Sequence, residues 1–250
     1  MSGHSKWSTI KRKKGAADAK RSKVFSRIVK EIQIAVKQSG SDPDSNPSLR
    51  VALQNAKGSN MPKSTVEKAI SKGESGTENF EEITFEGYGP DGVAIFVECL
   101  SDNNNRTVSE IRAIFTKYNG SLGKNGSLSY LFNRKAVFTI AKDLISEIDD
   151  FELEVIDAGA EEIELVDDKY IITAAFEDFG NMQKKLEEMK IEPESSEAVR
   201  IPNVEKEITV HTAEKNMKII DAFEENDDVQ NVFHDMGLTD EIIEALNDTE

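Results

Sequence analysis

Residues 162–175 read EIELVDDKYIITAA, two runs rich in β-branched and aromatic residues on either side of an Asp167–Asp168 turn. Such a pattern predicts a hairpin with strands over 162–166 and 170–175. Amphipathic helices are expected on both sides of it, over 144–156 and 179–189, with further strands at 137–140 and 198–201. The order strand, helix, strand, strand, helix, strand is the ferredoxin-like pattern. We therefore predict a ferredoxin-like βαββαβ domain over residues 134–202.

The segments on both sides of this domain are expected to form one discontinuous α+β domain, residues 80–133 plus 203–250. Before the insertion we predict strands at 83–88, 92–100 and 128–132, with a helix that begins in a capping box formed by Thr107 and Glu110. After the insertion we predict a strand at 207–210, a helix to about residue 225, a strand at 229–233 and a helix from residue 239. Neither group of elements has enough strands and helices to form a complete sheet with its own core. We therefore expect the two groups to pack together in one domain.

The sequence pattern of residues 1–75 predicts a small basic helical domain. Apolar residues recur at helical spacing from Val24 to Val36, and Gly40 ends this helix. Asn46 and Pro47 are typical of an N-cap and first helical position, and Ser64 with Glu67 predicts a capping box for a third helix. The linker GESGTEN, 73–79, follows. The predicted fold class is thus α+β, with three domains.

Charge is divided unevenly along the chain. Residues 1–72 hold sixteen Lys and Arg against five Asp and Glu, whereas residues 73–250 hold fifteen against forty-two. The net charge of the whole chain is −16, but this value combines two different parts. The cationic N-terminal part is suited to binding a polyanion, whereas the acidic remainder is not.

Composition argues against several other classes. Three separated histidines and the single Cys99 predict no disulfide, no zinc cluster and no cofactor. The stretch NGSLGKNGS lacks the Walker pattern, and the acidic pairs, such as Asp167 with Asp168, are typical of solvated turns and helix surfaces, so we expect no enzyme. No apolar run has the length of a signal peptide or a membrane helix, which predicts a cytoplasmic protein.

Seven motifs, in this order, carry a resemblance to a known family: GHSKW at 3–7, DPDSNPSLR at 42–50, NMPK at 60–63, EGYGP at 86–90, ECLSDNNNRTVSEIR at 98–112, GSLGKNGS at 120–127 and DDVQNVFH at 227–234. Together they closely resemble the YebC/PmpR family of transcriptional regulatory proteins, which includes a mitochondrial translational activator of cytochrome c oxidase subunit I. The resemblance implies the same three-domain α+β fold. It also implies a role in gene expression, as a DNA-binding transcriptional regulator or at ribosomes stalled on proline-rich sequences. Asn104 stands where the family usually has arginine.

The candidate nucleic-acid-binding residues are cations that could contact phosphates and one indole that could stack on a base. They are Lys6, Trp7, Lys11, Arg12, Lys13, Lys14, Lys20, Arg21, Lys23, Arg27, Lys30, Arg50, Lys63 and Arg106. The alternatives for the N-terminal cations are a disordered tail or a basic segment docked on the acidic part of the same chain, and the alternative for Trp7 is packing on the helix that begins at Val24. For the loop SDNNNR, the alternative is that Asp102, Asn103 and Asn105 satisfy backbone groups in a turn.

The leading hypothesis is a translation factor that acts on ribosomes through rRNA contact and relieves stalling at proline-rich sequences, with ribosomal proteins as possible partners. The alternative within the same class is a DNA-binding transcriptional regulator. An alternative of another class is a protein-interaction module without direct nucleic-acid binding. We expect a monomer and no membrane partner.

Overall fold

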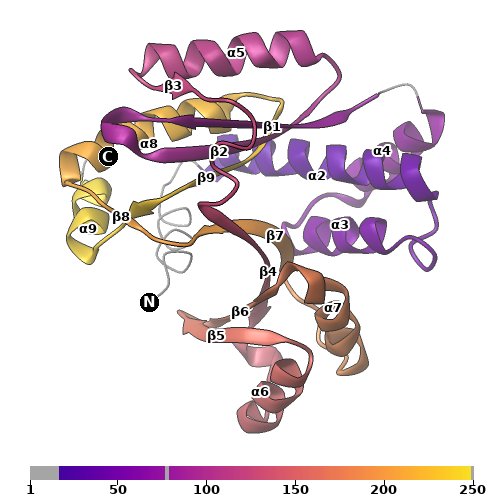
Figure 1. Ribbon diagram of the computed structural model, residues 1–250. Coiled ribbons are helices and arrows are strands. Elements are labelled where there is room, and N and C mark those ends of the chain that lie inside the picture. The colour runs from indigo at the N-terminus through magenta and orange to yellow at the C-terminus, as the bar shows by residue number, and fades with distance from the viewer. Residues whose placement is uncertain (1–16, 77–78, 249–250) are drawn as a thin grey trace. The chain divides into compact units, whose positions relative to one another are not determined.

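The computed structural model describes residues 17–76 and 79–248 of the chain, and side chains within 21–246. These residues form two compact units, each described separately below (Figure 1). One unit combines 79–133 with 200–248 and the start of the first helix, and the other combines 24–76 with 134–199. The helices and antiparallel sheets confirm the predicted α+β class. The division into three domains stays a prediction.

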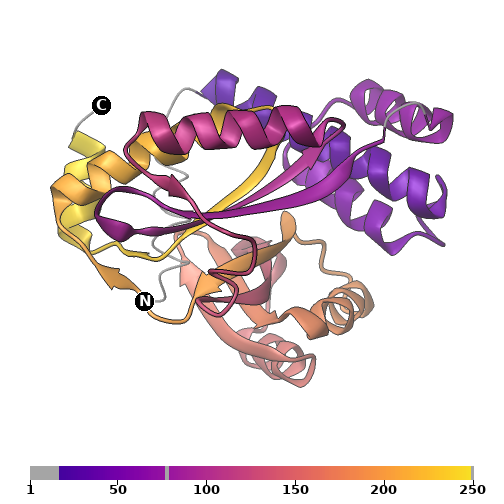
Figure 2. The same cartoon turned by 45° about the horizontal axis from the view of Figure 1, so that its top comes forward.

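The first unit is built on a four-stranded sheet with the order β3-β1-β2-β9. Its strands are β1 (Glu81–Tyr88), β2 (Ala94–Ser101), β3 (Ser121–Leu122) and β9 (Val229–His234). The helices α5 (Asn104–Lys117) and α8 (Val210–Glu225) cover one face (Figures 1 and 2). Phe115 and Phe223 meet edge to face in this core, with ring centroids 4.8 Å apart. The sheet thus joins segments from both sides of the insertion, as the sequence predicted.

The segment at 128–132 corrects one prediction. Only Phe132 is in a strand, because β4 begins there, whereas 126–131 form turns. The buried carboxylate of Glu86 accepts hydrogen bonds from the backbone N–H groups of Gly126, at 2.7 Å, and Leu128, at 2.5 Å. Leu128 is fully buried against Phe96 and Phe132 on the second face of the sheet. The carboxylate of Glu86 therefore accepts backbone hydrogen bonds in this segment, where we had expected a strand.

The C-terminal segment contains a second correction. The predicted strand at 207–210 is reduced to the two residues of β8 (Lys206–Glu207), which pairs in parallel with β10 (Met236–Gly237). Thr209 instead caps α8, since its hydroxyl accepts from the backbone N–H of Thr212 at 3.2 Å. The chain ends in α9 (Asp240–Asp248), whose Ile242 and Leu246 are buried in the same core as α8.

The second unit contains the predicted βαββαβ order. Its elements are β4 (Phe132–Ala141), α6 (Ile148–Asp157), β5 (Ala160–Val166), β6 (Lys169–Ala175), α7 (Phe179–Glu188) and β7 (Ser195–Pro202), and the sheet order is β5-β6-β4-β7. Each central strand therefore lies beside its antiparallel partner, as in ferredoxin-like folds. Ala136, Phe138 and Ile140 of β4 face the buried sides of α6 and α7.

The same unit holds the helices α3 (Pro47–Gly58) and α4 (Lys63–Ser75) and, from Val24 onward, the helix α2 (Ala17–Ser39). The predicted cap of α3 is confirmed, because Asn46 accepts from the backbone N–H of Leu49 at 3.1 Å. The predicted box at Ser64 is wrong: the N-cap of α4 is Pro62, two residues earlier, and no side chain caps the helix. The fixed φ of proline already supplies the extended backbone that an N-cap needs. Asn55 of α3 exchanges two hydrogen bonds with the backbone of Ser196, at 2.9 and 3.1 Å.

Candidate nucleic-acid interface

The loop SDNNNR connects the buried strand β2 to the helix α5. Asn103 caps α5, since its side-chain oxygen accepts from the backbone N–H of Arg106 at 3.1 Å. The capping box predicted at Thr107 and Glu110 is therefore wrong, because the helix starts at Asn104, one turn of chain earlier. Asn104 donates to the carboxylate of Glu81 at 2.7 Å. Asn103 thus satisfies a backbone group at the start of the helix, which was the alternative to anion binding, whereas Asn104 bonds to an acidic side chain.

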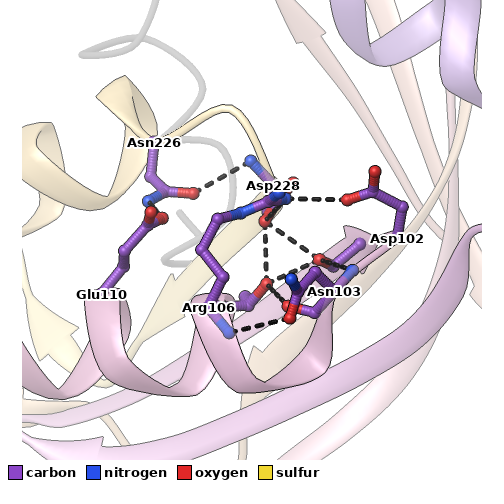
Figure 3. Close-up of polar contacts among 8 residues, drawn as sticks. Asp102, Asn103, Arg106, Glu110, Asn226 and Asp228 are labelled. Carbon is purple, nitrogen blue, oxygen red and sulfur yellow. Dashed lines mark hydrogen bonds and ion pairs between the residues drawn. The ribbon is translucent and has the colours of Figure 1, made fainter.

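A buried carboxylate from a distant part of the chain organises this loop. The Oδ2 atom of Asp228 lies 3.0 Å from Ser101 Oγ, 2.8 Å from Thr107 Oγ1 and 2.8 Å from Arg106 Nη2 (Figure 3). The backbone of Asp228 is also bonded, because its N–H donates to Asn226 and its carbonyl accepts from the N–H of Leu100. Asp228 is 5 % exposed, so its charge needs these donors.

Arg106 lies between two carboxylates. One nitrogen, Nη2, is 2.9 Å from Asp102 Oδ1 and 2.8 Å from Asp228 Oδ2 (Figure 3). The hydrogen bonds that Arg106 donates to Asp228 and, second, to Asp102 raise its pKa above the ordinary value, so the guanidinium stays charged. The side chain is 44 % exposed and can be reached from solvent. An incoming phosphate would nevertheless meet the half-exposed Asp102 beside it, which makes this the least favourable of the candidate contacts.

The described candidates on α2 differ in their exposure. Lys23, Arg27 and Lys30 follow one another at four- and three-residue spacing and so share one side of the helix. All three are half-buried, and Lys23 donates to the carboxylate of Asp227 at 2.6 Å and to the carbonyl of Glu225. Arg21 is exposed. Among the described residues of α2, Arg21 is therefore the candidate most accessible to a phosphate.

The remaining candidates are spread over other places. Lys63 begins α4 with a 91 % exposed side chain, 3.9 Å from Glu67. Arg50 on α3 is half-buried, 3.9 Å from Glu187. Lys6, Trp7, Lys11, Arg12, Lys13 and Lys14 lie outside the described residues, as does the side chain of Lys20.

Two further cations belong with Lys63 on the exposed surface of α4. Lys68 and Lys72 are exposed and lie four residues apart, on one side of the helix. The sequence prediction omitted them because it selected cations by clustering along the chain. The helical spacing, with Ala69 and Gly73 as the buried positions, was the signal that could have identified them.

Family models match two adjoining parts of the chain: one described as the TACO1/YebC protein N-terminal domain over residues 5–76, and one as the TACO1/YebC second and third domain over 80–236. The chain belongs to the TACO1/YebC family. Similar proteins are a "probable transcriptional regulatory protein" of Amoebophilus asiaticus, 48 % identical with 95 % of this chain and 98 % of that protein covered, and one of the same name in Citrifermentans bemidjiense, 46 % identical with 98 % and 100 % covered.

A solved structure is also similar to this chain. It is the crystal structure of a conserved hypothetical protein from Aquifex aeolicus, with 38 % identity and a TM-score of 0.77, covering 88 % of this chain and 91 % of that one. This likeness extends the family assignment from the sequence to the fold.

In this TACO1/YebC chain, motifs that are far apart in the sequence contact each other. EGYGP supplies Glu86, which holds the backbone of GSLGKNGS, and DDVQNVFH supplies Asp228, which holds the start of SDNNNR. Both acids are buried and both accept from groups of the segment that they organise. The motif residues that carry the resemblance thus have a structural use in fixing two loops of the first unit.

Proposed function

We propose that this protein is a nucleic-acid-binding translation factor that contacts rRNA on the ribosome and relieves stalling at proline-rich sequences. Family membership supports a role in gene expression, and the charge division supports the mode of contact. The observation that carries the proposal is the excess of cations in residues 1–72 over an acidic remainder. The phosphate backbone repels the acidic residues 73–250, whereas the cationic residues 1–72 can bind the phosphates.

The proposed contacts are the candidate cations of the first 72 residues, with Trp7 stacking on an unpaired base. Within 1–16 lie Lys6, Lys11, Arg12, Lys13 and Lys14 and no acidic residue. Exposed cations of the described helices are added on α2 and α4, where Arg21, Lys63 and Lys68 face solvent. Arg106 is proposed as a weaker contact, because two carboxylates already share its charge.

A DNA-binding transcriptional regulator is the second candidate function. The names of the two relatives, both probable transcriptional regulatory proteins, favour it. Sequence-specific DNA binding needs side chains that reach base edges from one element in a groove. The exposed candidate cations of the described helices are instead distributed over α2 and α4, an arrangement suited to phosphate contacts on a structured RNA.

No helix of the described residues is both long enough and apolar enough to cross a membrane. We place the proposed activity in the cytoplasm, with a monomer that binds the ribosome and, as further partners, ribosomal proteins. The protein is proposed to act by binding alone, without a cofactor or catalytic turnover.

The test changes Lys11, Arg12, Lys13 and Lys14 to Glu. We expect loss of co-sedimentation with ribosomes and new ribosome pauses at proline-rich sequences, while transcript levels stay unchanged at first. A matched control changes four exposed lysines elsewhere, Lys142, Lys190, Lys215 and Lys218, to Glu and so has the same net charge. If the first variant gives no new pauses but promoter occupancy and RNA levels change at once, the DNA-binding function replaces the proposed one.

A further inference from the structure

Exposed apolar side chains gather in one part of the second unit. Of the eight large apolar side chains exposed among the described residues, four lie between 144 and 165. They are Leu144, 49 % exposed, Leu153, 64 %, Ile156, 53 %, and Leu165, 49 %. Single exposed apolar residues are ordinary on protein surfaces, but neighbouring ones mark interaction sites.

The outer side of α6 holds two of the four. Phe151 and Val155 point into the core, so Leu153, midway between them in sequence, lies on the opposite side of the helix. Ile156 follows one turn later on the same outward half. Leu153 and Ile156 therefore do not belong to the core, which contains only the side chains on the inner side of α6.

The other two lie at the edge strand beside α6. β5 is the outermost strand of its sheet, and Ile163 packs against the core together with α6. Leu165, two residues on, points to the same face of the sheet. The backbone N–H of Lys142 donates to the carbonyl of Asp168 at 2.9 Å, which places the turn with Leu144 next to this end of β5. Figures 1 and 2 show α6 alongside β5. We name these four side chains and their surroundings the α6 face.

The charge around the α6 face is mostly negative, with the exposed Lys142 at its edge. Residues 143–168 contain twelve Asp and Glu and no Lys or Arg. Lysines from neighbouring elements reach two of these acids, since Lys185 lies 2.6 Å from Glu154 and Lys135 lies 2.5 Å from Glu161. Asp143, Glu147, Asp149, Asp150 and Asp157 are exposed. The apolar side chains are thus surrounded by acids, most of them facing solvent.

This charge decides what can cover the face. A nucleic acid or an anionic membrane would bring further negative charge, and a second copy of the chain would set the same acids against each other. We propose that the α6 face binds a basic protein segment that carries apolar side chains. Its cations pair with the acids, its apolar side chains cover Leu153 and Ile156, and its backbone has access to the open edge of β5 for strand addition.

The test uses the full chain and two labelled eleven-residue peptides, one alternating Lys and Leu and one alternating Lys and Ser. We expect fluorescence anisotropy to show binding of the Lys/Leu peptide about tenfold tighter than the Lys/Ser peptide. The double variant Leu153→Ser and Ile156→Ser should lose this about tenfold advantage, since both side chains are exposed and their loss leaves the core intact. A matched control, Tyr130→Ser and Val204→Ser, removes two apolar side chains elsewhere that are even more exposed and should leave both affinities unchanged.

A photo-crosslinking residue at position 153 in cells provides the second measurement. We expect cross-linked segments with net positive charge and apolar residues, and their loss when Asp149 and Asp157 are changed to Lys. The proposal is overturned if the two peptides bind equally, if the double variant keeps the advantage, or if the cross-links are to nucleic acid. It is also overturned if sedimentation shows a dimer of this chain that the double variant abolishes.

Discussion

The Asp228 cluster and the basic N-terminal part of the chain use their charges in opposite ways. In the cluster, the carboxylate of Asp228 is buried and each nearby donor, from Ser101, Thr107 or Arg106, is directed at it. In the N-terminal part, side chains such as Arg21 and Lys63 face solvent. Charges used inside the protein stabilise the fold, whereas charges left in solvent are available to a partner. Changes in the two regions should therefore affect different properties.

The largest effect on stability should come from Asp228→Ala. The change removes the buried acceptor of the Ser101 and Thr107 hydroxyls and one of the two carboxylates beside Arg106, which keeps Asp102, so we expect a loss of about 3 kcal/mol in the free energy of unfolding, measured in urea. Nucleic-acid affinity of the folded protein should change little, because Asp102 stays beside Arg106 and the N-terminal cations are untouched. The control Asp227→Ala removes a 90 % exposed carboxylate next to it and should cost less than about 1 kcal/mol. Equal losses in the two variants would contradict this account of the cluster.

A smaller effect is expected at the cap of α3. Asn46 is 1 % exposed, accepts from Leu49 N–H, and donates to the carbonyls of Ala35 at 2.7 Å and Gly40 at 2.8 Å. Asn46→Ala should therefore lower the free energy of unfolding by about 2 kcal/mol. Ser48→Ala, on the exposed side of the same turn, should change it by less than about 0.5 kcal/mol. A melt of Asn46→Ala that superimposes on the unchanged protein would exclude this role.

Glu31 on α2 gives a still smaller, pH-dependent effect. Burial raises its pKa from 4.5 to about 7; Arg27 opposes this rise and Glu197 adds to it. Because the unfolded chain loses this proton first, stability should fall as pH rises from about 4.5 to 7, by about 1–2 kcal/mol for a partly exposed group. Glu31→Gln should remove this dependence and be the more stable form at pH 8. Urea melts at pH 5 and pH 8 measure both quantities, and parallel pH profiles would contradict the prediction.

The sequence predicted most elements but not the contacts between them. Hydrophobic periodicity located the βαββαβ order and the helices of the N-terminal part, and the Asn46–Pro47 cap was correct because its partners are local. The capping box at Thr107 was wrong because Asn103, four residues earlier, already caps the helix. The strand at 128–132 was wrong because the backbone N–H of Leu128, like that of Gly126 before it, bonds to the side chain of Glu86. Such pairing depends on tertiary packing, as does the contact between Ser101 and Asp228, 127 residues apart.

For the candidate nucleic-acid interface, too, some features could be predicted from the sequence and others could not. The clustering of cations along the chain could be seen in the sequence, whereas the solvent exposure of each cation could not. Lys23 is paired with Asp227 and Arg106 with Asp102 and Asp228, pairs that span up to 204 residues. Lys68 is exposed although it was not selected. The location of the positive charge was thus predictable, and the internal use of single cations was not.

The most direct test of the division of charge is the salt dependence of RNA binding by the full chain. We predict that log K for a single-stranded RNA oligonucleotide falls with log salt by about 0.7 per phosphate contacted. Changing Lys11, Arg12, Lys13 and Lys14 to Gln should then lower the magnitude of this slope by up to about 3, whereas Asp228→Ala should leave it unchanged in the folded protein. If the fourfold variant keeps the slope and affinity of the unchanged protein, the N-terminal cations are not the nucleic-acid contact.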